Sequence, residues 1–251
     1  DPRQAVETCG MVEQMASDEI LTGITGDPMW ADNCENVAFN TYPAAVMPDF
    51  KGLRYLTAPN MVISDSKDHA PGIQNEGPFL MMNPFSSRCC QHNHSQGWPY
   101  YEEHLWMATQ DNGIAALLYN SSEVSAKVGN RTGHTVRLKQ TTHYPFDENI
   151  KIEINTSSAV DFPLDLRSPK WCDDPIITVN GKPINIKAVA SSYIRLENKW
   201  KQGDVIELTL PMKLSIQTWT ENKNSVSVNY GPLTFSLKID EDYIKMDSKK
   251  S

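Results

Sequence analysis

The sequence predicts an α+β protein in which helices come first and an antiparallel β-sandwich follows. Residues 6–41 repeat apolar side chains at helical spacing. From residue 114 onward, about nine short β-rich runs alternate with turn residues. Because no helical pattern separates these runs, they favour an antiparallel sandwich over a parallel sheet with crossover helices.

Composition narrows the classes of function. The chain has 251 residues, of which 39% are hydrophobic and 22% charged, as is typical of a globular protein. The formal net charge is -8 and no dense lysine or arginine cluster is present, so we expect no nucleic-acid partner. No run approaches the roughly 18 consecutive apolar residues that a membrane span requires, so we expect no membrane span.

The first segment predicts two helices joined by a short turn. Residues 6–24 place apolar side chains near a 3.6-residue period, and Gly26 ends this pattern. Asp27 and Pro28 are typical of an N-cap followed by proline in the first turn, and an apolar face then continues to Thr41. We expect the two helices to form an antiparallel hairpin.

A long irregular segment is expected at residues 48–96, where prolines and glycines interrupt every regular pattern. A loop of this length inside a compact protein is usually functional. A third helix is predicted after it, with Pro99 in its first turn and an apolar face running from Trp98 to Ala108.

The pattern changes to strands after Asp-Asn-Gly at residues 111–113. We therefore expect a helical domain with a long active-site loop at residues 1–112 and a β-sandwich region at residues 113–251. Asn180-Gly181 is typical of a tight hairpin turn, and residues 201–204 separate two further strands.

The five cysteines are the most distinctive chemical feature. They are too few for a disulfide framework, and Cys89 and Cys90 are adjacent, with Cα atoms about 3.8 Å apart, closer than disulfide geometry prefers. Zinc takes about four ligands from cysteine, histidine and carboxylate side chains, and Glu7 with Cys9 would complete such a set. The alternative is that Cys9 only packs, as free cysteines often do, and spacing alone leaves both interpretations open.

Other candidate residues have structural alternatives. His92, beside the cysteine pair, would line a pocket or hydrogen-bond the loop backbone. Trp98 would stack on a sugar ring, although aromatic residues at helical spacing are more often part of a core. Cys34 and Cys172 are predicted to be packing residues. The sequence contains no P-loop, G-x-S-x-G, H-E-x-x-H or Rossmann glycine pattern. Of the motifs considered, the cysteine cluster is therefore the one that suggests a chemical mechanism.

Several motifs resemble the bacterial β-L-arabinofuranosidases of glycoside hydrolase family 127 and relatives such as family 146, formerly domain of unknown function 1680. The most specific motifs are ETCGM at residues 7–11 and RCCQHN at residues 88–93. The others extend the resemblance over nearly the whole chain: YLTAPN at 55–60, GWPY at 97–100, DNG at 111–113, YPF at 144–146, LRSPKW at 166–171 and YGPL at 230–233.

The resemblance implies a fold and a mechanism. The fold would be the last helical hairpins of an (α/α)6 barrel followed by β-sandwich domains. A zinc ion would be held by Glu7, Cys9, Cys89 and Cys90, and Cys89 would be the nucleophile of a retaining glycosidase acting on plant-type arabinose-containing oligo- or polysaccharides. A metal-bound thiolate would then replace the usual carboxylate nucleophile.

The chain departs from the family pattern at its start. The family's acid/base glutamate precedes the E-x-C pair by about two helical turns or more, whereas no glutamate precedes Glu7 here. We expect this chain to be the C-terminal portion of a larger enzyme, inactive alone, whose partner is the N-terminal part of the barrel. Two alternatives stay open, a non-catalytic carbohydrate-binding module and a structural zinc protein, and the compartment is open between the bacterial cytoplasm and the periplasm or exterior.

Overall fold

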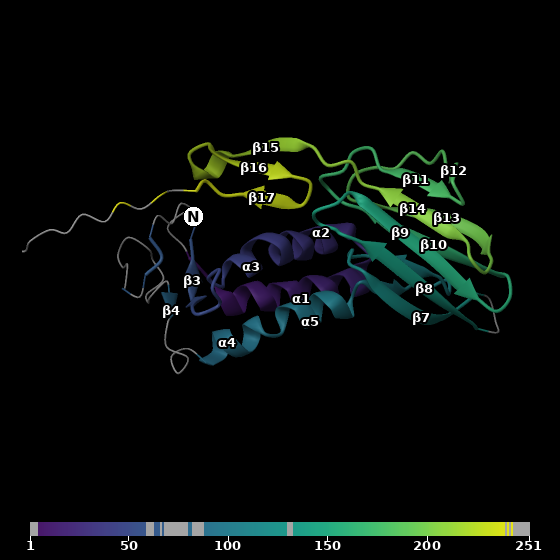
Figure 1. The fold of residues 1–251 in the computed structure, drawn as a ribbon, viewed down its shortest axis with the longest axis horizontal. Helices are drawn as coiled ribbons and strands as arrows, with labels where there is room; N and C mark the ends of the chain where they lie inside the picture. The colour runs from purple at the N-terminus through teal and green to yellow at the C-terminus, as the bar shows by residue number, and fades with distance from the viewer. Residues whose placement is uncertain are drawn as a thin grey trace, which may run out of the picture.

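The computed structural model describes residues 5–58, 63–65, 67, 80–81, 88–129, 133–238, 240 and 242. Helices occupy the middle of the molecule, a two-sheet β-sandwich lies at one end, and a three-stranded sheet runs along one side of the helices (Figure 1). The fold is therefore a mixture of helices and several sheets, with helices first, as predicted. Within the described residues, every helix is too short or too polar to cross a lipid bilayer.

The first two helices form where the sequence predicts them. Helix α1 is Thr8–Thr25 and helix α2 is Pro28–Asn36. Gly26 adopts a left-handed conformation (φ 66°) that ends α1, and the Asp27 carboxylate accepts a hydrogen bond from the backbone N–H of Met29 at 2.9 Å. The chain continues as a π-helix and a short α-helix: η1 at Val37–Thr41 and α3 at Tyr42–Ala44.

Two further helices pack on α1. Helix α4 is Arg88–His94 and helix α5 is Gly97–Glu103. The prediction that the third helix extends to Ala108 is wrong, because the backbone of His104 leaves the helical conformation (φ -114°, ψ 23°) and residues Trp106–Ala108 form strand β5. Pairing of β5 with strand β6 (Ile114–Ala116) therefore overrides the helical periodicity.

Two short strand pairs border the helices. Strand β1 (Val6–Glu7) pairs with β3 (Leu56–Thr57), and β2 (Leu53–Arg54) pairs with β4 (Leu80–Met81). The predicted irregular segment at residues 48–96 falls partly outside the described residues. Residues 53–54, 56–57, 80–81 and 88–94 within it are regular.

The sandwich consists of a four-stranded sheet, ordered β13-β10-β6-β5, and a six-stranded sheet, ordered β12-β11-β14-β9-β8-β7. One hydrophobic cluster contains inward side chains of both sheets, among them Leu138, Ile152, Leu164 and Trp200. The strands not yet bounded are β7 at Ser122–Val128, β8 at His134–Thr142, β9 at Asn149–Thr156, β10 at Val160–Ser168, β11 at Ile176–Val179, β12 at Lys182–Pro183, β13 at Ser192–Trp200 and β14 at Val205–Thr209.

One pairing departs from the predicted antiparallel pattern. Strands β6 and β10 are parallel, with Ile114 opposite Leu164. Strands β7, β8 and β9 of the six-stranded sheet lie between β6 and β10 in the chain. The chain then re-enters the four-stranded sheet as β10, which runs in the same direction as β6. The domain boundary near residue 112 stays a prediction, and β5 and β6 pair across it.

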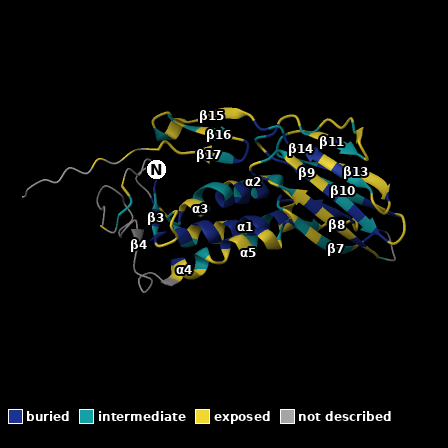
Figure 2. Ribbon diagram, viewed as in Figure 1, coloured by how far each residue is buried: buried dark blue, intermediate teal, exposed yellow. Residues whose placement is uncertain are grey.

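A third sheet has its apolar side chains on the outside. It consists of β15 (Leu214–Trp219), β16 (Ser225–Tyr230) and β17 (Leu233–Phe235), with the 3-10 turn η2 (Thr220–Asn222) after β15. Much of β15 and β16 is coloured as exposed in Figure 2. Alternate residues of these strands are large, apolar and exposed: Leu214, Ile216, Val226, Val228 and Tyr230. Asn40 of η1 ties the sheet to the helices through hydrogen bonds with the carbonyl of Pro232 at 3.0 Å and the N–H of Thr234 at 2.7 Å.

Candidate metal centre

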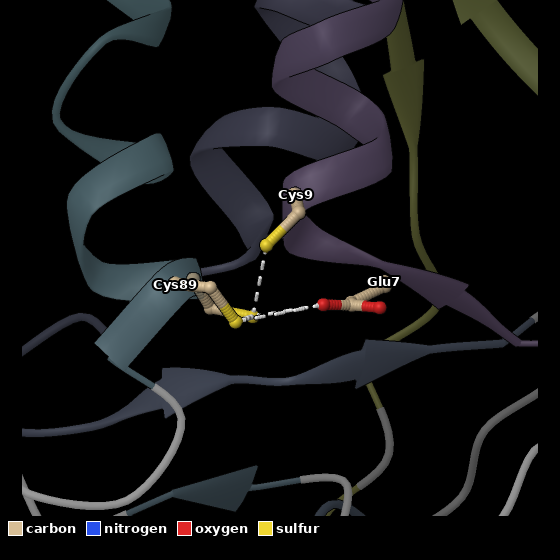
Figure 3. Close-up of side chains that lie close together, drawn as sticks. Glu7, Cys9 and Cys89 are labelled. Atoms are coloured by element: carbon tan, nitrogen blue, oxygen red, sulfur yellow. Dashed lines mark hydrogen bonds between the residues drawn. The ribbon is translucent and has the colours of Figure 1, made fainter.

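Four side chains from two distant parts of the chain meet at one end of α1. Glu7, Cys9, Cys89 and Cys90 place one carboxylate oxygen and three sulfur atoms within 4.8 Å of one another. Glu7 lies on β1, Cys9 in the first turn of α1, and both other cysteines in the first turn of α4 (Figure 3). The structure thus brings together the four residues that the sequence analysis proposed as ligands.

The strand-to-helix junction explains how Glu7 and Cys9 point to the same place. On a regular helix, residues two apart point to different faces, but Glu7 has an extended backbone (φ -75°, ψ 143°) and α1 begins only at Thr8. Thr8 fixes this junction by donating its N–H to the carbonyl of Tyr55 at 3.1 Å and its hydroxyl to the carbonyl of Arg54 at 2.5 Å.

Four separations between ligand atoms lie within about 0.5 Å of those expected around a tetrahedral ion with soft ligands. The Cys90 sulfur lies 3.3 Å from that of Cys9, 3.9 Å from that of Cys89 and 3.4 Å from the nearer oxygen of Glu7, while Cys89 and Glu7 are 4.0 Å apart. Zinc bonds of about 2.3 Å to sulfur and 2.0 Å to oxygen imply ligand separations of about 3.8 Å for two sulfurs and about 3.5 Å for sulfur and oxygen. Three thiols and one carboxylate are also a donor set that zinc prefers.

Burial differs among the three sulfurs. Cys90 has no exposed surface, Cys9 is half-buried, and Cys89 is exposed. A substrate can therefore approach Cys89 more readily than either other cysteine. Glu7, on the opposite side of the cluster, is half-buried.

Electrostatics disfavour free thiolates in this cluster. Burial raises the pKa of Cys90 above its usual range, and its hydrogen bonds with Cys9 and Glu7 raise that pKa further. Burial also raises the pKa of Cys9. A bound divalent cation acts in the opposite direction, because ligation stabilises the deprotonated sulfur.

Two residues near the cluster had no role in the sequence analysis. Tyr55 precedes β3, and its pKa is raised by burial and by the negative charges of Glu7 and the cysteines. Asn93 of α4 acts to lower the pKa of Cys9, against the increase that burial causes. The spacing of four residues between Cys89 and Asn93 was the signal that would have identified Asn93, because such residues share a helix face.

The other predicted site residues lie outside the four-residue cluster. His92 is exposed on α4. Trp98 is 40% exposed and packs edge-on against Tyr42 and Tyr101, with ring centroids 5.4 and 5.9 Å away, so aromatic packing accounts for its position. A substrate-binding role for either residue stays a prediction. Cys34 and Cys172 are buried, as expected for packing residues.

Comparisons with solved structures give the same fold. A protein described as a glycoside hydrolase is 25% identical with a TM-score of 0.75, covering 91% of this chain and 37% of its own. A GH127 β-L-arabinofuranosidase from Geobacillus stearothermophilus T6 is 22% identical with a TM-score of 0.79, covering 92% of this chain and 36% of its own. A GH127 β-arabinofuranosidase is 24% identical with a TM-score of 0.72, with the same coverages. The chain thus spans little more than a third of the length of these proteins.

Family comparisons identify two consecutive domains. The family model described as the β-L-arabinofuranosidase GH127 catalytic domain matches residues 1–103. The model described as the GH127 middle domain of the same enzymes matches residues 113–212. A comparison with curated proteins gave no match. The two adjoining family matches show that this chain belongs to glycoside hydrolase family 127.

Proposed function

We propose that the chain is the nucleophile-bearing portion of a retaining β-L-arabinofuranosidase that acts on plant-type glycans containing arabinose. The observation that carries the proposal is the convergence of three sulfurs and one carboxylate, with one sulfur, that of Cys89, exposed. Family membership and the names of the solved relatives support the substrate class.

Glu7, Cys9, Cys89 and Cys90 would hold the metal ion, and their donor set favours zinc. When bound, zinc supplies positive charge that keeps its cysteine ligands deprotonated near neutral pH. Glu7, Cys9 and Cys90 then act as holding ligands, since each is at least half-buried. Cys89 alone combines ligation with access to substrate.

The proposed chemistry has two steps at Cys89. Its sulfur attacks the anomeric carbon and forms a C–S bond while the bond to the leaving-group oxygen breaks, and that oxygen takes a proton from a general acid. Water then attacks the same carbon after giving a proton to the same group, the C–S bond breaks, and the sulfur leaves with its electron pair. Two displacements at one carbon retain its configuration.

The general acid lies outside this part of the enzyme in our proposal. No glutamate precedes Glu7 in the sequence, whereas the resemblance places the family's acid/base glutamate upstream of that position. We infer that the N-terminal part of an (α/α)6 barrel supplies it, together with most of the sugar pocket. The partner of this chain is then that part of the barrel.

A pair of cysteine substitutions in the larger enzyme tests the proposal. Cys89→Ser should lower hydrolysis of an aryl β-L-arabinofuranoside on the order of 10³-fold or more while the fold is retained. Cys34→Ser, at a buried cysteine outside the cluster, is the matched control and should retain activity. Near-normal hydrolysis by Cys89→Ser would contradict the nucleophilic role. If the 251-residue chain alone turned over substrate at the rate of a complete family member, this would contradict the proposal that the general acid comes from another part of the enzyme.

A further inference from the structure

The outward face of the six-stranded sheet carries a polar groove. Strands β8, β9, β14 and β11 lie side by side in this sheet, at the end of the molecule away from α4, whose first turn contains Cys89 and Cys90 (Figure 1). The groove crosses these four strands and has a volume of about 390 Å³. This volume falls within the roughly 300–1,000 Å³ of small-molecule sites. The groove is therefore a candidate binding site remote from the metal centre.

The strand register arranges the lining residues in two rows. Ile150 and Leu208 belong to the sandwich core, so their neighbours along β9 and β14 point outward. The first row consists of residues directly opposite one another on the four strands: Thr141, Lys151, Glu207 and Thr178. The second row is built in the same way from three strands: Asn149, Thr209 and Ile176. Because opposite side chains have Cβ atoms only about 4.5–5.5 Å apart, one ligand can contact several members of a row.

The first row places a carboxylate beside an ammonium group. Thr178 donates its hydroxyl to Oε2 of Glu207 at 3.0 Å, which orients the carboxylate. Oε1 of Glu207 has no hydrogen-bond partner among the described residues, so it can accept from a ligand. Lys151 pairs with Glu153 at 2.9 Å, and its ammonium group has further N–H donors for a ligand.

The second row continues into the loop between β8 and β9. This loop adds His143 and Asp147 to the lining of the groove. Asp147 accepts hydrogen bonds from the backbone N–H and the side-chain amide of Asn149, both at 2.9 Å, which fixes the loop against the sheet. At the other end of the row, Ile176 is 56% exposed and provides an apolar surface. The groove thus offers polar contacts for hydroxyl groups and an apolar contact for the C–H groups of a sugar ring.

We propose that this groove binds an uncharged segment of an arabinose-containing polysaccharide. The inference rests on the proposed substrate class. A hydroxyl group both donates and accepts, so one sugar hydroxyl can donate to Glu207 and accept from Lys151 on the adjacent strand. An anion would face the carboxylates of Glu207 and Asp147, and a cation would face Lys151, so a neutral polyhydroxyl ligand satisfies the groove better than either.

The composition of the groove also favours a sugar over a protein partner. Its lining, as formed by the described residues, contains none of the tryptophan, tyrosine and arginine side chains that dominate protein–protein hot spots. A second attachment point on the sandwich would raise the local concentration of a long substrate at the reactive site, which a small glycoside could not exploit. The two kinds of substrate therefore separate the groove from the reactive site.

Calorimetric titration of the 251-residue chain with an oligosaccharide of four arabinose units measures binding directly. Glu207→Gln keeps the size of the side chain but removes its charge, and Lys151→Met removes the ammonium donor. Each should weaken binding about 10-fold, because each replaces a charged hydrogen-bonding partner. Glu123→Gln is the matched control, since Glu123 lies exposed on β7 of the same sheet and outside the groove. It should bind the oligosaccharide as the wild-type chain does.

Kinetics of the larger enzyme give the second readout. Glu207→Gln should raise KM for an arabinose polysaccharide and leave kcat and KM for an aryl β-L-arabinofuranoside unchanged, because the small substrate does not span the distance to the groove. Glu123→Gln should change neither substrate's constants.

The outcomes distinguish this inference from the proposed function. If the wild-type chain does not bind the oligosaccharide, or if Glu207→Gln and Lys151→Met bind it as tightly as Glu123→Gln, the groove is not a sugar site and the role of Cys89 stands. An unchanged KM of Glu207→Gln for the polysaccharide would also overturn the inference. If Cys89→Ser hydrolyses the aryl glycoside normally, the proposed function is overturned, whereas the titration still reports sugar binding by the groove independently.

Discussion

The sulfur of Cys9 lies 3.3 Å from the sulfur of Cys90, although 81 positions separate the two residues in the chain. Cys9 is fixed by the junction of β1 and α1, and Cys90 by the first turn of α4. An ion bound between them would cross-link α1 and α4, so its binding energy would add to the stability of the fold.

Metal removal should therefore destabilise the helical part of the molecule. We expect a strong zinc chelator to lower the Tm of the reduced chain, and zinc at 100 times its Kd to contribute about 2.7 kcal/mol. Differential scanning calorimetry with and without the chelator measures this effect. Cys90→Ala, which removes the buried ligand, should show no response to the chelator. Equal Tm values for the wild-type chain in both conditions would contradict the cross-link.

The buried Glu19 predicts a pH dependence of stability. Burial raises its pKa to about 8, with Asp18 and Glu103 adding to the increase and the Cys34 thiol opposing it. Its carboxyl oxygen lies 2.7 Å from Nδ1 of His104, and a protonated Glu19 can donate a hydrogen bond to that nitrogen, which satisfies both buried atoms. In the unfolded chain Glu19 ionises near pH 4.5, whereas in the folded protein it ionises near pH 8. The stabilisation that comes from protonated Glu19 is therefore complete below pH 4.5 and is lost as the pH rises through about 8.

Glu19→Gln tests this assignment, because its amide N–H can also donate to His104 but does not titrate. Between pH 5 and pH 8 the wild-type free energy of unfolding should fall relative to the variant on the order of 2 kcal/mol. Asp18, whose pKa burial raises to about 6, adds a slope of the same sign that both proteins share. Urea unfolding at several pH values measures the difference, and parallel profiles would show that Glu19 is ionised in the folded protein.

Arg167 joins the sandwich to the helices. Its guanidinium is fully buried on β10 and forms ion pairs with Asp32 and Glu35 of α2. We expect Arg167→Met to cost about 3–5 kcal/mol, because it leaves buried carboxylates unpaired.

Arg195, on the neighbouring strand β13, is the matched control. It also pairs with acidic residues, including Asp111 and Glu197, but is 41% exposed. Arg195→Met should cost about 1 kcal/mol or less, because solvent screens exposed pairs. Urea denaturation compares the two variants, and equal costs would refute the distinction between the buried and exposed networks.

The outward face of the third sheet provides a further test. Ile216 on β15 is 72% exposed, whereas Ile152 in the sandwich core is fully buried. Ile152→Ala should lower the free energy of unfolding by about 2–5 kcal/mol. Ile216→Ala should change it by no more than about 0.5 kcal/mol. A cost at Ile216 as large as at Ile152 would show that another surface covers this face in solution.

Local sequence signals predicted the elements that local chemistry determines. Gly26, Asp27 and Pro28 correctly located the joint between α1 and α2. Asn180-Gly181 correctly located the turn between β11 and β12, where both residues have positive φ. These residues act through backbone conformation and capping, which depend little on the rest of the chain.

Features that depend on long-range pairing were missed. The helical pattern through Ala108 gave way to the pairing of β5 with β6, and the parallel pairing of β6 with β10 has no local signal. At the candidate site, spacing alone left Cys9 open between packing and ligation, and Tyr55 had no assigned role, because only the tertiary structure brings its segment to the start of α1.

Zinc stoichiometry tests the central claim most directly. The 251-residue chain is purified under reducing conditions, dialysed against trace zinc, and its bound metal is measured by atomic emission beside Cys90→Ala and Cys34→Ser. We predict about one zinc per wild-type chain and per Cys34→Ser chain, and a large loss in Cys90→Ala, since four ligands hold a closed tetrahedral site. A wild-type chain without zinc, or equal zinc in the wild-type and Cys90→Ala chains, would contradict the assignment of Glu7, Cys9, Cys89 and Cys90 as a metal centre.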